Sequence, residues 1–308
     1  MRKLIMMLLF VSLLALPAMA EEADLSRAWL DAQYESLVPA GVDAQRTEEA
    51  YTLALSGDAR ALSLRITVEG DLRFGRYAQY VRTALLDPDT GDALGLDAVF
   101  SDTDALQDFL NDYVEERVQG TLNTYLDADD LLPVPLENVY FDAYGVTFHY
   151  PGERFQYFSG HAGAVQLQWY ELRELLAIPE PEAALPLEVG GQIDDLLEAY
   201  GSLTEPDLVQ GGEIYEFESP LLRGVQAIAD DAGLVTALRY GRFSMQGAEP
   251  GMAWDAAEAL LGAPEVTTEI TAEAAQLLRL EPGVRAVYPD YSLYYDAGGT
   301  LYLLETAL

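Results

Sequence analysis

Two stretches in the C-terminal half of the chain decide its fold: GGQIDDLLEAYG at Gly190–Gly201 and PGMAWDAAEALLGAP at Pro250–Pro264. Each predicts a short helix that ends at a glycine, the residue that most often closes a helix. A hairpin pattern follows each stretch, at Val225–Arg239 with a turn at 230–233 and at Tyr291–Leu304 with a turn at 296–299. The unit is a helix followed by antiparallel strands, and two copies of it predict a two-layer α+β domain.

A proline- and glutamate-rich stretch, IPEPEAALP at Ile178–Pro186, has the composition of a stiff linker. We therefore expect an N-terminal domain at 21–177, the linker at 178–186, and the helix-plus-hairpin repeat domain at 187–308. The N-terminal domain also reads as α+β, an antiparallel sheet covered by helices. Its predicted strands are Tyr51–Ser56, Ala61–Glu69, Tyr77–Leu86, Asn138–Asp142, Val146–Tyr150 and Ala164–Gln168, and its predicted helices lie at 101–120 and 169–177.

Two local patterns in this domain are specific enough to test. In Ala61–Glu69, four aliphatic residues alternate with Ser63, Arg65 and Thr67, which is the period of a strand buried on one face only. At the start of the 101–120 helix, Ser101 is placed to cap the free amides, and Asp104 follows near the positive helix end.

The N-terminus has the layout of a secretory signal peptide. Arg2 and Lys3 precede an apolar run at 4–16, and Ala18-Met19-Ala20 offers small residues at a cleavage site. The alternative is an uncleaved anchor, but the run is shorter than the roughly 20 residues that span a bilayer. We expect cleavage of 1–20 and a secreted, extracytoplasmic protein that does not insert into the membrane.

The composition is strongly acidic: 52 Asp and Glu oppose 17 Lys and Arg, which gives a net charge of −35. Such a field repels nucleic acid and anionic membranes and attracts basic partners. An alternative interpretation is that the acidity serves solubility or a salty habitat, and it then says nothing about a partner. The absence of cysteine excludes disulfides and thiol catalysis.

No motif predicts a metal, a cofactor or a catalytic centre. The only histidines are His149, in a predicted strand, and His161, in a predicted loop, and neither has a metal-binding spacing. Ser159 lies near His161 but lacks the glycine elbow of a serine hydrolase. The acidic turn that begins at Asp87 departs from a calcium loop, because its twelfth position is Ala98. We expect a protein that is not an enzyme.

The block from about Phe74 to Leu176 resembles the extracytoplasmic domain of RsiV-type anti-sigma factors, which also accompanies some peptidoglycan deacetylases. The resemblance is carried by DPDTGDALGLDAVF at Asp87–Phe100, by the helix that follows it, and by YFDAYGVTFHYPGERFQYFSG at Tyr140–Gly160. The family includes a receptor for lysozyme, so the resemblance implies a basic cell-wall hydrolase as partner. It also implies a contact loop at 151–157 in which Pro151, Glu153 and Tyr157 are the candidate binding residues, whereas Gly152 and Gln156 depart from the family pattern.

The region at about 187–308 is similar to the BamE/SmpA-like repeat of exported bacterial proteins, in which a G-M-x-x-x-x-V-x-x-L-L-G-x-P helix precedes a hairpin. Gly251-Met252 and Leu260-Leu261-Gly262-Ala263-Pro264 carry this likeness. It implies a scaffold or binding module.

The sequence therefore favours a secreted, non-enzymatic binding protein that recognises a basic protein such as lysozyme. One alternative is an envelope module that binds peptidoglycan or another glycan through exposed aromatic rings, and another is a hydrolase with a hidden site. The rings that such a glycan site would use cluster near the C-terminus, although sheet packing is the favoured interpretation for most of them: Tyr288, Tyr291, Tyr294, Tyr295 and Tyr302.

Overall fold

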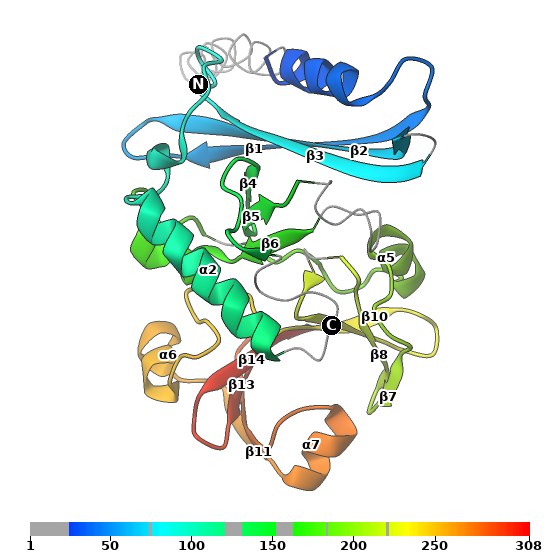
Figure 1. Cartoon of the computed structure of the whole chain (residues 1–308). Helices are drawn as coiled ribbons and strands as arrows, with labels where there is room; N and C mark the ends of the chain where they lie inside the picture. The colour runs from blue at the N-terminus through cyan, green and yellow to red at the C-terminus, as the bar shows by residue number, and fades with distance from the viewer. Residues whose placement is uncertain (1–24, 74–75, 121–130, 152–162, 183, 220–221) are drawn as a thin grey trace, which may run out of the picture. The chain divides into compact units, whose positions relative to one another are not determined.

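The computed structural model describes residues 25–73, 76–120, 131–151, 163–182, 184–219 and 222–308 (Figure 1). The expected signal peptide at 1–20 lies outside these residues. The chain divides into two compact units, one within Met1–Leu167 and Leu172–Pro181, the other within Gln168–Glu171 and Glu182–Leu308. Each unit contains antiparallel sheets accompanied by helices, which confirms the predicted α+β class.

In the described part of the N-terminal unit, a helix at 25–37 is followed by a meander of three antiparallel strands. These strands are β1 (Ala44–Ala54), β2 (Arg60–Arg73) and β3 (Arg76–Leu86), in the order β1-β2-β3. The sequence prediction of the first strand was too short, because the first half of β1 is polar and half-exposed. Its pairing along β2, from Ala44↔Gly70 to Ala54↔Arg60, holds it in the sheet.

The alternation in β2 is confirmed, but its polar face is not open to solvent. Ile66 and Val68 pack with Leu30 of the 25–37 helix on one face of the sheet. Figure 1 shows this helix lying along the sheet of β1, β2 and β3. On the other face Ser63 is fully buried, and its Oγ accepts a hydrogen bond of 2.9 Å from the Phe141 amide. The period predicted a strand buried on one face only, and this was wrong because a second small sheet covers the polar face.

That second sheet consists of β4 (Val139–Asp142), β5 (Gly145–His149) and β6 (Ala164–Leu167), in the order β4-β5-β6. The predicted hairpin between β4 and β5 is confirmed. Its turn is closed by Asp142 Oδ1, which accepts from the amides of Tyr144 at 2.8 Å and Gly145 at 3.0 Å. The segment predicted as a short helix at 169–177 is a 3-10 helix, η2 (Trp169–Leu175).

The long helix α2 (Thr103–Gly120) follows the one-turn 3-10 helix η1 (Leu96–Ala98). Its predicted cap was wrong by one residue. Asp102 Oδ1 accepts from the amides of Asp104 at 2.9 Å and Ala105 at 3.1 Å, whereas Ser101 Oγ donates to the Leu175 carbonyl. The β-bridge between Phe100 and Leu176 holds Ser101 beside Leu175, so the Asp102 carboxylate caps the helix instead of the Ser101 hydroxyl.

The C-terminal unit is built on one eight-stranded antiparallel sheet in the order β11-β12-β13-β14-β10-β9-β8-β7. Two four-stranded meanders meet edge to edge at β10 and β14. The strands are β7 (Asp207–Val209), β8 (Gly212–Glu216), β9 (Val225–Ala229), β10 (Val235–Tyr240), β11 (Val266–Ile270), β12 (Gly283–Val287), β13 (Ser292–Asp296) and β14 (Leu301–Ala307).

The predicted repeat is confirmed at the level of single hydrogen bonds. Helix α5 (Ile193–Tyr200) precedes the first meander, and its Ile193 amide donates to the Gly233 carbonyl at 2.9 Å. Helix α6 (Trp254–Leu261) precedes the second, and its Trp254 amide donates to the Gly299 carbonyl, also at 2.9 Å. The helices end at Gly201 and Gly262, whose φ angles are 71° and 82°.

The two hairpin turns repeat the same chemistry. Asp230 Oδ1 accepts from the amides two and four residues later, at 2.9 and 3.0 Å. Asp296 Oδ1 does the same at 2.8 and 2.9 Å. Each turn therefore closes on a carboxylate that accepts two backbone amides, which is typical of aspartate in turns.

The copies differ in how their first two strands are joined. A short turn at 210–211 joins β7 to β8, whereas helix α7 (Ala272–Leu278) lies between β11 and β12. Sequence analysis predicted neither α7 nor these four strands. The edge strands β7 and β11 are almost wholly exposed, so they lack the alternation that marks a buried strand.

Candidate functional site

The structure describes only part of the predicted contact loop. Pro151 is exposed at the end of β5, whereas Glu153, Tyr157, Ser159 and His161 lie outside the described residues. The described part of the chain contains no group of three or more His, Cys, Asp or Glu that could hold a metal ion. None of its helices combines the length and hydrophobicity that a membrane crossing requires.

A partly buried polar cluster lies between the two sheets of the N-terminal unit. Arg65 of β2 pairs with Glu49 of β1 through two hydrogen bonds, and its Nη1 lies 3.5 Å from His149 Nε2. The guanidinium also stands 4.3 Å from the ring centroid of Tyr140. The strand register explains the ion pair between Arg65 and Glu49, because the two residues are direct partners in the β1–β2 ladder.

His149 in this cluster is a neutral core side chain. Burial lowers its pKa to about 3, and the Arg65 charge acts in the same direction. Because arginine is always a donor, the neutral ring accepts at Nε2 and carries its proton on Nδ1. This confirms the interpretation of His149 as a structural residue of the hairpin.

His149 makes the fold sensitive to acid. The unfolded histidine titrates near pH 6.5 and the folded one near 3. Between these values the unfolded state binds more protons, so stability falls as the pH is lowered. Burial also raises the pKa of Asp142 to about 6, so this carboxyl opposes the loss as the pH falls from about 6 to 4. We expect His149→Gln to flatten the decline of the urea midpoint between pH 6.5 and 4.

The control for this measurement is the other histidine. His161→Gln removes the other histidine of the chain, and the slope of urea midpoint against pH should be flatter in His149→Gln than in His161→Gln. An equal slope in the wild type and in His149→Gln would show that proton uptake by His149 does not drive the acid sensitivity.

A second polar cluster crosses four neighbouring strands of the C-terminal sheet. Arg239 Nε of β10 donates to Glu305 Oε2 of β14 at 2.8 Å, and both side chains are more than nine-tenths buried. Tyr294 of β13 donates from its hydroxyl to Glu305 Oε1 at 2.6 Å. Arg285 of β12 reaches the same oxygen from Nη2 at 3.4 Å.

Strand register assembles this cluster. Arg239 and Glu305 are direct partners in the β10–β14 ladder, and Arg285 and Tyr294 are direct partners in the β12–β13 ladder. Ser292, opposite Glu305, accepts from Arg285 Nε at 3.1 Å. Sequence analysis named Tyr294 only as one of the C-terminal tyrosines and missed the other members of the cluster. The members lie on four different strands, and only the strand pairing brings them together.

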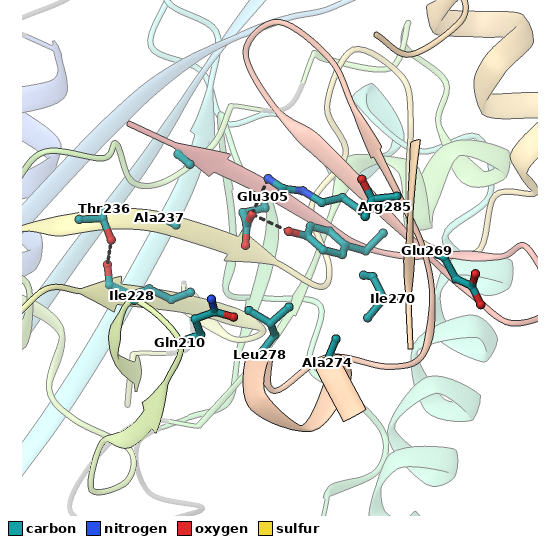
Figure 2. Close-up of a pocket in the computed structure, with 14 residues that line it drawn as sticks. Gln210, Ile228, Thr236, Ala237, Glu269, Ile270, Ala274, Leu278, Arg285 and Glu305 are labelled. Atoms are coloured by element: carbon teal, nitrogen blue, oxygen red, sulfur yellow. Dashed lines mark hydrogen bonds and ion pairs between the residues drawn. The ribbon is translucent and has the colours of Figure 1, made fainter. Parts of the chain in front are cut away.

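A cavity of about 380 Å³ lies between this cluster and α7 (Figure 2). Figure 2 shows Arg285 and Glu305 along one side of it and Leu278 and Ala274 of α7 along the opposite side. Helix α7 is tied across the sheet, since Leu277 accepts from the Gln210 amide at 3.1 Å and Leu278 accepts from Arg239 Nη1 at 2.7 Å.

The chemistry of this cavity suits binding better than proton transfer. Glu305 Oε2 accepts from Arg239, and Oε1 accepts from Tyr294 and Arg285, so both oxygens are already engaged within the cluster. Burial and the Glu305 charge raise the pKa of Tyr294, which keeps its hydroxyl protonated. Arg285 is the charged group with room for a ligand, because 38% of its side chain is exposed.

The C-terminal tyrosines are mainly sheet packing, as favoured from the sequence. Tyr288, Tyr291, Tyr294 and Tyr295 are each less than a tenth exposed, and Tyr302 is half-buried. A half-buried ring that borders open space is Trp254 of α6. It packs on Tyr295 with ring centroids 4.6 Å apart, and the two line a groove of about 620 Å³.

Comparison with known proteins gives a likeness to solved structures. No family model and no curated protein matches the chain. A DUF3298-family protein of Bacteroides fragilis aligns with 50% of this chain and 63% of its own, at 17% identity and a TM-score of 0.29. A DUF3298-family protein of Pseudomonas aeruginosa aligns with 47% and 67%, at 10% identity and a TM-score of 0.30.

The chain is similar to bacterial DUF3298-family structures over about half of its length. It spans less than two thirds of the length of the Bacteroides fragilis protein.

Proposed function

We propose that the chain is a secreted, non-enzymatic binding protein that recognises a basic protein. The observation that carries this proposal is that most arginines of the C-terminal unit are paired with carboxylates of the same unit. Between 182 and 308 there are 22 Asp and Glu and five Arg. Four of these arginines form ion pairs with carboxylates of the same unit: Arg239, Arg242, Arg279 and Arg285.

Because these arginines are paired within the unit, the unpaired charges on its surface are mainly those of Asp and Glu. Asp194 and Asp195 in the first turn of α5, and Asp255 in the first turn of α6, are exposed. A carboxylate in the first turn of a helix interacts favourably with the positive helix end. A basic protein that approaches such a surface is steered by a long-range attraction and meets few cations of like charge.

The partner class follows from the family resemblance. A domain like that of the RsiV-type receptors would take a lysozyme-like cell-wall hydrolase, with Pro151, Glu153 and Tyr157 as contact residues. The BamE/SmpA-like repeat would then be the scaffold of the molecule. Export by the N-terminal signal would bring the protein to the compartment in which such hydrolases act.

The test is a calorimetric titration of the cleaved chain, residues 21–308, with a c-type lysozyme at low and at physiological salt. We expect saturable binding that survives physiological salt, where the Debye length is about 8 Å, and that exceeds the binding of an unrelated protein of equal positive charge. Binding that vanishes with salt, or that equals the control, would contradict a specific receptor and reduce the acidity to a bulk property.

Two variants locate the contact. Glu153→Ala should weaken binding at least tenfold, as expected for one partner of a close ion pair at an interface. Asp255→Ala removes the same charge from an exposed site on α6 and should change the affinity less than twofold. Equal effects of the two variants would show that net charge alone sets the affinity.

A further inference from the structure

We propose that the cavity under α7 binds a small organic carboxylate with an apolar tail. The ligand carboxylate would pair with Arg285, and its tail would lie along the apolar side of the cavity. This site would bind a small molecule, and the proposal does not depend on the surface that would bind a basic protein.

Arg285 is the cation among the described residues that line the cavity. It shares the carboxylate of Glu305 with Arg239, a buried arginine that does not line the cavity, so Arg285 has no carboxylate to itself. Glu269 also borders the cavity, but its carboxylate points away from Arg285 (Figure 2). In a chain of net charge −35, two arginines that share one carboxylate are a local exception.

Arg285 presents the geometry that a carboxylate prefers. Its described hydrogen bonds run from Nε to Ser292 and from Nη2 to Ser292 and Glu305. Within the described residues these contacts leave both Nη1 hydrogens available, and they hold the guanidinium plane in place. A guanidinium that is already held in place loses little freedom when Nη1 donates to a ligand carboxylate, a group that arginine binds well.

The far side of the cavity is apolar. Ile270 belongs to one small core cluster and Ile228 to another, and the cavity separates the two clusters. Ala274 and Leu278 of α7 line the cavity on the side opposite Arg285 and Glu305 (Figure 2). A cavity of about 380 Å³ holds roughly a dozen non-hydrogen atoms at the density of liquid water, near 30 Å³ per molecule.

The test is a titration of the cleaved chain with butyrate, hexanoate and octanoate at constant ionic strength, followed by calorimetry. Each added methylene should tighten binding about fourfold until the cavity is filled. Pentan-1-ol, with the same five-carbon tail and no charge, should bind at least tenfold more weakly than hexanoate. Equal binding of the alcohol and the acid, or no saturation by any of the three carboxylates, would overturn the proposal.

Two variants assign the site. Arg285→Gln should weaken hexanoate binding at least tenfold, whereas Arg223→Gln, an exposed arginine that does not line the cavity, should leave it unchanged. Ala274→Leu keeps Arg285 and fills the apolar end, so it should shorten the chain length that binds best. If Arg285→Gln does not fold, the Ala274→Leu result still decides, because an unchanged chain-length preference would place the ligand elsewhere.

Discussion

Glu305→Leu is expected to lower the free energy of unfolding of the C-terminal unit by about 3–5 kcal/mol. The substitution leaves Arg239 buried without its carboxylate and removes the acceptor of the Tyr294 hydroxyl. An uncompensated buried charge is among the most destabilising changes in a protein interior, because desolvation is no longer offset by pairing. Urea unfolding followed by circular dichroism measures the loss.

A double variant separates the missing charge from the missing contacts. Arg239→Met with Glu305→Leu removes both charges and keeps the volume, so it should be more stable than Glu305→Leu alone. Glu265→Leu, which removes an exposed carboxylate, is the matched control and should change stability by about 0.5 kcal/mol or less. The interpretation fails if the double variant is as unstable as the sum of its single variants.

Gly283→Ala is expected to lower the free energy of unfolding by about 3 kcal/mol or more. A Cβ built on Gly283 would lie 1.9 Å from the Tyr295 carbonyl oxygen and 2.8 Å from the Asp296 carbonyl carbon. Both are backbone atoms, so no side chain can move aside, and β12 must separate from β13. Overpacking of this kind costs about 1–3 kcal/mol in ordinary cores, and a clash with backbone lies at the upper end.

The repeat provides a second site and a control for this substitution. A Cβ on Gly212, at the start of β8, would lie 1.9 Å from the Ala229 carbonyl oxygen, so Gly212→Ala should be equally damaging. Gly191 has no atom within 4 Å of such a Cβ and no left-handed φ, so Gly191→Ala should be neutral or stabilise the fold by up to about 1 kcal/mol. Similar losses at Gly191 and Gly283 would contradict the steric explanation.

The two glycines extend the repeat beyond what the sequence showed. Gly212 opens β8 and Gly283 opens β12, and each approaches the last residue of the neighbouring hairpin strand. The helix stretches and the hairpin turns were visible in the sequence because they carry local signals, namely a helix-ending glycine and an Asp-x-x-Gly turn. The first two strands of each copy were not visible, because α7 interrupts one copy and the edge strands carry no apolar period.

The sequence by itself determined the local structure of this protein: the α+β class, the alternation in β2, the β4–β5 hairpin, and the repeated helix and turn. These features depend on residues close together in the chain, and their signals survive without tertiary context. Only the tertiary structure decided where polar residues of apolar strands would meet. Arg65 gained its contact with His149 because a second sheet covers the polar face of β2. Arg239, Arg285, Tyr294 and Glu305 became one cluster because the register of four strands aligned them, and a register is set by pairing between distant segments.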